Sequence, residues 1–127
     1  MKDAKTSFEV MEALQRQTFD YFLHEANPLN GLVIDKTQAG APASIAAVGL
    51  ALSSYPVGVE RGFMTRAQAI QRTLATLRFF RNSVQSADPD ATGYKGFYYH
   101  FLDMASGKRA WKCELPRSIP RFSWQAC

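Results

Sequence analysis

The segment from Ala43 to Tyr55 constrains the fold of this chain more than any other. It is predicted to form a helix, because Pro42 suits a first helical turn and Pro56 is expected to stop the helix. The residues 45–52 are all apolar, so this helix has no polar face for most of its length. A helix that is apolar on all sides must be buried on all sides. The sequence therefore predicts partner elements around it.

Two amphipathic helices flank this buried helix. The first is predicted over 6–26, from the capping box Thr6-Ser7-Phe8-Glu9 to a stop before Pro28. The second opens at the capping box Thr65-Arg66-Ala67-Gln68. Their apolar stripes are Met11, Leu14, Thr18, Phe19 and Phe22 in the first helix, and Ile70, Thr73, Leu74, Leu77 and Phe80 in the second. Alternating outer and inner helices are what a toroid of helical hairpins requires, so we expect an all-α fold that is an incomplete part of a larger domain.

The stretch 93–115 gathers aromatic rings, two carboxylates and a histidine. Side chains alternate along a strand, so Phe97, Tyr99, Phe101 and Asp103 should share one face. Ser106-Gly107 is a turn signal, and 109–112 is expected to return as a short second strand. The pattern predicts an aromatic β-hairpin with acids at its ends. Such a surface suits a sugar, and an ordinary hairpin packed by its rings is the alternative.

Composition excludes several classes of function. The 127 residues suffice for one small domain, and 46% hydrophobic residues favour a folded core. The formal charge of +4 comes without a basic run, which argues against nucleic-acid binding. No Cys/His spacing resembles a zinc site and no cofactor motif is present, so no metal or cofactor is expected. With no transmembrane-length apolar run and no signal peptide, we expect no membrane partner and a cytoplasmic location for the chain as written.

Eight short segments of the sequence, taken in their order along the chain, indicate a family. They are 17–22, 25–28, 30–33, 40–49, 55–62, 73–80, 93–103 and 111–115, and include Gln-Thr-Phe-Asp-Tyr-Phe at 17–22 and Gly-Tyr-Lys-Gly-Phe-Tyr-Tyr-His at 93–100. In these segments the chain resembles the glucoamylase-like family of glycoside hydrolases, over roughly residues 8 to 115. That family includes endo-β-1,2-glucanases, and a similar domain occurs in cyclic β-1,2-glucan synthases. The resemblance implies the opening helices of an (α/α)6 barrel several times longer than this chain.

Hydrolysis of a glycosidic bond commonly uses two carboxyl groups. Asp103 and Glu114, at opposite ends of the expected hairpin, are the predicted catalytic acids, with the acid and base roles unassigned. Each has a structural alternative. Asp103 could cap the turn at 105–107, and Glu114 could pair with Lys112 or Arg109 on the surface.

The predicted substrate-binding residues are aromatic rings for stacking and cations for sugar hydroxyls. They are Tyr94, Lys95, Tyr98, His100, Arg109 and Trp111. At least half of the aromatic residues in this stretch should be core, because a hairpin lying on helices buries one face. A structural histidine at His100 and solvated charges at Lys95 and Arg109 are the alternatives.

The resemblance implies a glucan oligosaccharide or polysaccharide as partner, with β-1,2-glucan first. We expect this chain to be an inactive fragment, because a barrel without most of its helices leaves the flanks of the 43–55 helix exposed. A non-catalytic carbohydrate-binding or scaffolding domain, like those in the synthases, is one alternative, and a small independent helical domain is another. Members of the family are often periplasmic or exported.

The chain departs from the family pattern after Leu115. Members of the family continue with a sequence like Ser-Thr-Ile-Asp-Thr-Ala-Leu-Leu-Leu-Ala-Gly-Val, in an inner helix that carries an acidic residue. Residues 116–127 instead contain two prolines and show neither helical nor strand periodicity. A back-translation of this tail can be chosen that, when read from the last base of the codon for Leu115, encodes the family's twelve-residue sequence. We therefore divide the chain into 1–115, the N-terminal part of a glucoamylase-like catalytic domain, and 116–127, an aberrant frameshifted tail.

Resequencing of the locus tests this division. The expected result is a frame that continues past codon 115 as the family's inner helix, whether the shift is a sequencing error or a pseudogene. An intact frame through 116–127 in independent reads of several close relatives contradicts it.

Overall fold

The computed structural model describes the backbone of residues 2–115 and the side chains from residue 6 onward. Three helices dominate it: α1 (Lys2–His24), α2 (Ile45–Glu60) and α3 (Arg66–Asn82). The short strands are β1 (Ala43–Ser44), β2 (Gly93–Tyr94), β3 (Phe97–Tyr98) and β4 (Phe101–Leu102). The predicted helical fold with a short strand pair is therefore confirmed. The tail expected to be frameshifted, 116–127, lies outside the described residues.

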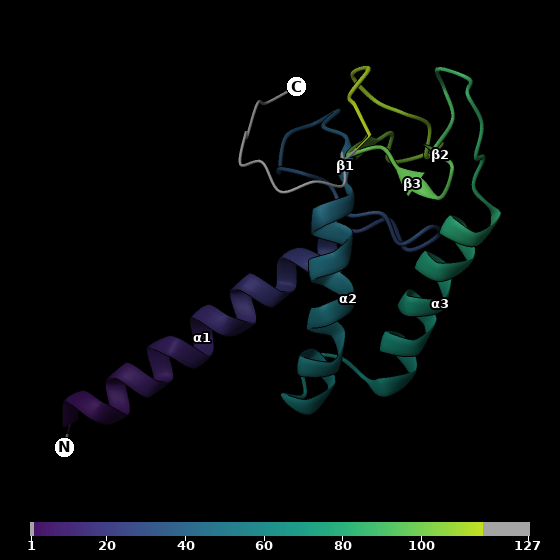
Figure 1. Ribbon diagram of the computed structural model, residues 1–127. Helices are drawn as coiled ribbons and strands as arrows, with labels where there is room; N and C mark the ends of the chain where they lie inside the picture. The colour runs from purple at the N-terminus through teal and green to yellow at the C-terminus, as the bar shows by residue number, and fades with distance from the viewer. Residues whose placement is uncertain (1, 116–127) are drawn as a thin grey trace.

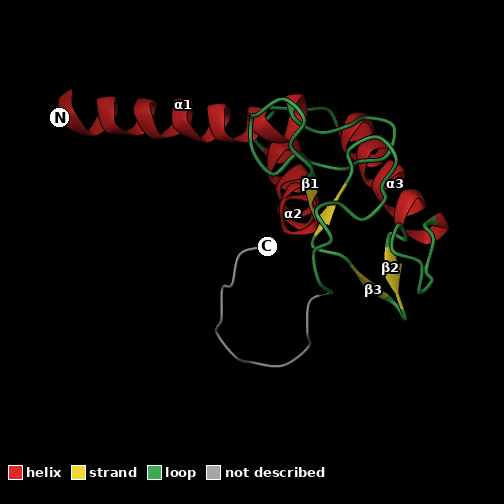
Figure 2. Ribbon diagram, turned by 90° about the horizontal axis from the view of Figure 1, so that it is seen from above, coloured by secondary structure: helices red, strands yellow, loops and turns green. Residues whose placement is uncertain are grey.

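The strands form two antiparallel pairs. One joins β1 to β4 and the other joins β2 to β3. Figure 1 shows α2 and α3 running side by side in opposite directions, with the strands and loops gathered where α2 begins. Figures 1 and 2 both show α1 projecting away from this body. Only the C-terminal part of α1 meets the rest of the described chain.

The core lies where the chain after α1 crosses the start of α2. Leu32, Val33, Ala43 and Leu102 are inaccessible to solvent. Isolated bridges pair Ala26 with Val33 and Ile34 with Ala43, so the chain is extended after the turn at Asn30-Gly31. The backbone N–H of Ile45 donates to the carbonyl of His100 at 3.1 Å, so the strand region is fastened to the first residue of α2.

The first helix begins earlier than the sequence predicted. Thr6 lies inside α1 rather than at its N-cap, because the preceding residues include good helix formers and the helix runs back to Lys2. Its end at His24 is close to the expected end at Ala26. Phe19 packs into the core, whereas Met11 is 65% exposed. The expected stripe is thus covered only near its C-terminal end.

The predicted stop of the second helix at Pro56 is wrong, because α2 continues to Glu60 with Pro56 inside it. Pro56 lies on the exposed face, where water can hydrate the helix carbonyl that proline leaves without a donor. Val48, Ala51, Tyr55 and Gly58 form the buried face. A side chain at Gly58 would collide with the Phe19 ring, so this glycine lets α1 approach.

The opposite face of α2 has no cover among residues 6–115. Leu50 is 61% exposed and Val57 46% exposed, and Ala46 and Gly49 lie on the same side. Burial on all sides, which the sequence requires of this helix, is therefore achieved on one side only. This is the expected state of an inner helix whose further neighbours are not part of the described chain.

The capping box that was predicted to open α3 is confirmed. The Thr65 hydroxyl accepts from the Gln68 N–H at 3.2 Å, and the Gln68 side chain accepts from the Thr65 N–H at 2.9 Å. The predicted apolar stripe of α3 packs only in part: Phe80 packs against the core, whereas Ile70, Leu74 and Leu77 are exposed.

A different face of α3 packs, and polar groups give the reason. Thr76 is buried against Gly31. Arg72 donates from Nη2 to the Leu23 carbonyl at 3.0 Å and from Nη1 to the Phe22 carbonyl at 3.5 Å. These carbonyls lie at the C-terminus of α1, where the helix dipole favours a cation. Specific polar contacts therefore orient α3, and the hydrophobic period alone did not predict them.

Replacement of Gly31 by alanine tests this packing. Gly31 has φ +73°, and a Cβ there would collide with the Thr76 side chain. Gly40 is a matched control, with φ +77° and nothing within 4 Å of the added atom. We expect Gly40→Ala to cost about 1–2 kcal/mol from backbone strain alone. Gly31→Ala should cost about 1–3 kcal/mol more from overpacking. Urea unfolding measures both, and equal costs would contradict the Gly31–Thr76 contact.

Candidate functional site

The aromatic hairpin differs in register from the one predicted. β2 and β3 pair through Gly93–Tyr98 and Tyr94–Phe97. Lys95 and Gly96 form the two-residue turn, with φ of 51° and 86°. These positive values are typical of the turns that fit a tight hairpin. The Lys-Gly pair between aromatic residues was the signal that could have predicted this turn.

The predicted second strand over 109–112 is wrong. Leu102 and Arg109 form a single bridge, and the Asp103 N–H donates to the Lys108 carbonyl at 2.8 Å. The chain then turns instead of extending, because Trp111 and Lys112 have φ of 55° and 53°. β4 takes its main partner from β1 instead, in the pairs Ala43–Leu102 and Ser44–Phe101. The expected face of four alternating residues is broken between β3 and β4.

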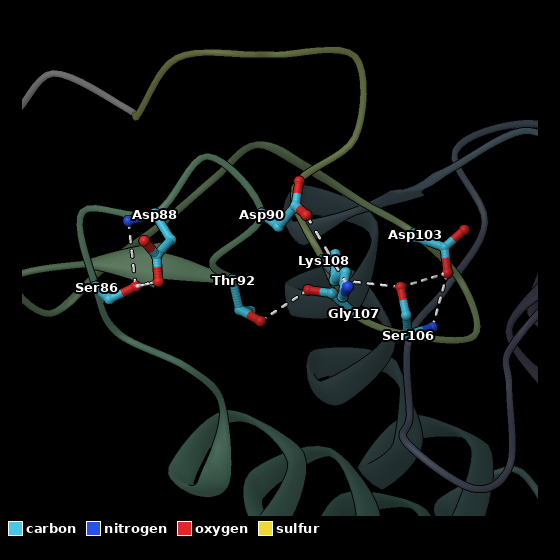
Figure 3. A network of polar contacts seen from close by, with 8 residues as sticks. All are labelled: Ser86, Asp88, Asp90, Thr92, Asp103, Ser106, Gly107 and Lys108. Atoms are coloured by element: carbon cyan, nitrogen blue, oxygen red, sulfur yellow. Dashed lines mark hydrogen bonds and ion pairs between the residues drawn. The ribbon is translucent and has the colours of Figure 1, made fainter.

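Asp103 lies in the tight turn that follows β4 (Figure 3). Its Oδ1 accepts three hydrogen bonds, from the Ser106 N–H at 2.7 Å, the Ser106 hydroxyl at 2.7 Å and the Ala105 N–H at 3.1 Å. These bonds, those from Ser106 above all, lower the pKa of Asp103 from its ordinary value of 3.8. The side chain is exposed, and within residues 6–115 its Oδ2 accepts no hydrogen bond.

Further polar contacts join this turn to the loop after α3. The Thr92 hydroxyl donates to the Gly107 carbonyl at 2.8 Å, and Thr92 is buried. Lys108 Nζ lies 4.0 Å from Asp90 Oδ2, with both side chains largely exposed. Figure 3 shows the two loops side by side through these contacts. The exposed pair adds little stability, so the buried Thr92 bond is the contact that positions the Asp103 turn.

Trp111 is the most exposed ring of the region at 57%. Its ring centroid lies 5.0 Å from that of Phe101, and the Phe101 centroid lies 4.5 Å from that of His100. A positive φ is a strained conformation for a bulky residue and is concentrated at functional sites. His100, Phe101 and Trp111 therefore form a row of rings whose outer member faces solvent.

Arg109 holds this turn in place. Its Nη2 donates to the Lys112 carbonyl at 2.6 Å, and its Cζ lies 4.3 Å from the centroid of the Tyr99 ring. Tyr99 is buried, so the guanidinium rests on the core. Arg109 is thus a positioned group and not a freely solvated charge.

The remaining predicted residues lie either in the β2–β3 hairpin or in the segment around Cys113. Tyr98 packs on α3, donating its hydroxyl to the Phe80 carbonyl at 3.2 Å. Tyr94 lies beside the Lys95 ammonium, at 5.2 Å from Nζ to the ring centroid. Glu114 is exposed and follows the buried Cys113, whose Sγ accepts from the Phe101 N–H at 3.3 Å. The structure therefore brings together His100, Arg109 and Trp111, with the segment of Glu114 alongside, and leaves Tyr94, Lys95 and Tyr98 in the separate β2–β3 hairpin.

The part of the chain that the structure describes contains neither a metal-binding cluster nor a membrane-spanning helix. No group of three or more His, Cys, Asp or Glu side chains there could hold a metal ion. No helix in the same part is long and apolar enough to cross a bilayer.

Replacement of Ser106 by alanine tests the electrostatics of Asp103. The change removes a hydroxyl donor to Oδ1, so the pKa of Asp103 should rise toward 3.8 while the backbone donors keep part of the shift. A lowered folded pKa means that the stability from these bonds is present above the unfolded pKa and is lost as pH falls through the folded value. Carbon-13 NMR titration of the carboxyl measures the change, with Ser86→Ala as control. An unchanged Asp103 titration in Ser106→Ala would contradict the assignment.

Two comparisons show which known proteins this chain is similar to. The chain is 30% identical over 105 residues to an exo beta-1,2-glucooligosaccharide sophorohydrolase (non-reducing end) from Parabacteroides distasonis, a match that covers 81% of this chain and 13% of that protein. The fold matches a crystal structure of a candidate glucoamylase from Bacteroides uniformis with a TM-score of 0.67 and 34% identity, covering 78% of this chain and 23% of the other.

No family model matches the sequence. The chain spans less than a quarter of each of these two proteins. Both matches nevertheless extend over more than three quarters of this chain, and they join sequence similarity to a shared fold. The described residues are therefore a segment of a glucoamylase-like glycoside hydrolase.

Proposed function

We propose that residues 93–114 form one wall of the substrate site in a glucan-acting glycoside hydrolase domain. The observation that carries this proposal is the row of rings that ends in exposed Trp111, on a strained turn that Arg109 fixes. An indole face packs against the C–H groups of a sugar ring, and a positioned guanidinium donates to its hydroxyls. The strain at Trp111 is consistent with a ring held ready for a ligand.

β-1,2-linked glucan is the proposed substrate. The similar protein from Parabacteroides distasonis is described as acting on beta-1,2-glucooligosaccharides, and the match to it includes most of this chain. A β-1,2 linkage bends the chain at each sugar, so a single exposed ring suits it better than a long flat row of rings.

Asp103 and Glu114 are the proposed carboxyl pair. The lowered pKa keeps Asp103 ionised at neutral pH, which suits a charge-stabilising or nucleophilic carboxylate and not a proton donor. Glu114, in the segment beside Phe101, then takes the part of the acid. We propose that this chain alone does not complete the reaction, because the similar enzymes are several times longer.

A non-catalytic carbohydrate-binding role is the second candidate. The observation that favours it is the Asp103 carboxylate, which already accepts three hydrogen bonds within its own turn. In that case the rings would bind glucan and the acids would be structural.

Calorimetric titration with gluco-oligosaccharides of defined linkage tests the sugar site. We expect the chain to bind β-1,2-linked oligosaccharides in preference to β-1,3- and β-1,4-linked ones. Trp111→Ala should weaken binding by about tenfold, the upper range for loss of a stacked ring. The control is Leu29→Ala, at a side chain that is 88% exposed and lies outside the ring row.

A reducing-sugar assay on the same samples separates binding from turnover. We expect no sugar release from β-1,2-glucan by the wild-type chain. Release would contradict the proposed inactivity, and equal binding by wild type and Trp111→Ala would contradict the ring platform. Binding without turnover in a version that includes the remaining barrel would favour the second candidate.

A further inference from the structure

Two asparagine side chains converge on the peptide group that follows Asp103. Asn27 and Asn30 lie in the loop after α1, and each donates from Nδ2 to the carbonyl of Met104 at 3.0 Å. The two donors lie 77 and 74 residues away from this carbonyl in the sequence. Asn30 is buried, with 9% of its surface exposed. Two long-range hydrogen bonds from outside the Asp103 turn therefore fix this carbonyl.

The loop itself sets the direction of both amides. Asn27 Oδ1 accepts from the Leu29 N–H at 2.9 Å, and Asn30 Oδ1 accepts from the Leu32 N–H at 3.0 Å. A backbone N–H only donates and a carbonyl only accepts, so each amide keeps its oxygen on its own loop and its nitrogen toward Met104. Asparagine forms such local turns readily. Both donors are thus oriented by the loop that carries them.

The Met104 carbonyl belongs to the same peptide group as the Ala105 N–H. A trans peptide is planar, so its carbonyl and its N–H point in opposite directions. The carbonyl accepts from the two asparagines, and the N–H donates to Asp103 Oδ1 at 3.1 Å. Hydrogen bonds in such a chain polarise one another, so each strengthens the next. The asparagine pair therefore acts on the Asp103 carboxylate without touching it.

We propose that Asn27 and Asn30 are positioning residues for the Asp103 carboxylate, acting through the Met104–Ala105 peptide. They help to anchor Oδ1 and so leave Oδ2 as the oxygen that meets substrate. This inference rests on the proposed function, in which Asp103 is one of the carboxyl pair. It adds the loop after α1 to the elements on which the geometry of the reaction depends.

Anchoring of the turn as a whole is the alternative role, and the turn has other anchors. The Thr92 hydroxyl donates to the Gly107 carbonyl, and the Asp103 N–H donates to the Lys108 carbonyl. With these bonds the turn should keep its place when the asparagine donors are removed. A loss confined to the Ala105 hydrogen bond therefore separates orientation of the carboxylate from anchoring of the turn.

Proton–nitrogen NMR of the chain, recorded across the titration of Asp103, tests the inference. An amide proton that donates to a carboxylate shifts as the carboxylate ionises. The Ala105 and Ser106 amides both donate to Oδ1, so each reports on its own bond. The pH-dependent shift of Ala105 is the readout, and that of Ser106 is the internal control.

The test variants are Asn27→Ser and Asn30→Ser. Serine keeps an oxygen for the local turn and is too short to donate to Met104. Each variant should reduce the pH-dependent shift of Ala105 by about 10–30% or more, the strengthening estimated for one hydrogen bond by its neighbour. The Ser106 shift should be kept. Asn82→Ser, the same change at an exposed position of α3, is the matched control and should change neither amide.

Two results would overturn the inference. One is an Ala105 shift that is unchanged in both variants. The other is an equal loss at Ala105 and Ser106, which would show that the turn has loosened as a whole. Circular dichroism shows whether each variant folds, and Asn27 is only half-buried, so Asn27→Ser keeps the test decisive if Asn30→Ser unfolds.

Addition of a β-1,2-linked oligosaccharide separates this inference from the proposed function. In the wild-type chain the carboxyl carbon signal of Asp103 should move when the sugar is added. A signal that does not move contradicts the proposed carboxyl pair. The Ala105 shift is measured without sugar, so it tests the asparagine pair by itself.

Discussion

The helix α2 is apolar around its circumference and must find neighbours on every side. The described chain supplies them on one side, where Phe19 of α1 closes on Gly58, and Val48 and Ala51 belong to the same buried cluster as Ala43 and Leu102. Leu50 and Val57 on the other side remain in water. Full burial of each such side chain is worth roughly 1.5–3 kcal/mol. The missing burial of Leu50 and Val57 agrees with the comparisons, because both similar proteins are long enough to supply further helices.

The same helix also positions the candidate sugar site. β1 leads directly into α2 and pairs with β4, and the carbonyl of His100 accepts the Ile45 N–H. The ring row is therefore attached to the start of the inner helix and not to a free loop. The Thr92–Gly107 bond and the Cys113–Phe101 contact hold the flanking turns. A platform mounted in this way keeps its orientation, which stacking against a sugar ring requires.

Local signals in the sequence predicted those parts of the fold that depend on local chemistry. The Thr65 capping box, for example, follows from residues three positions apart. Two other features depend on tertiary structure. The helix α2 continues through Pro56 because an exposed proline destabilises a helix less than a buried one. The packing face of α3 is set by Arg72, which donates to carbonyls at the end of α1. The candidate residues His100, Arg109 and Trp111 were chosen as near neighbours in the sequence, and their role in a sugar site stays a prediction. Their arrangement depends on left-handed backbone at Trp111 and Lys112, for which the sequence carries no glycine signal.

Urea unfolding at a series of protein concentrations, followed by the helical circular dichroism signal, tests the central claim most directly. If the open face of α2 needs neighbours from outside residues 2–115, the chain alone lacks a complete cooperative core, and the helical signal should fall gradually at low urea concentration. A single steep transition of a monomer, with a midpoint independent of concentration, would contradict the account, because it would show that one covered face of α2 is enough.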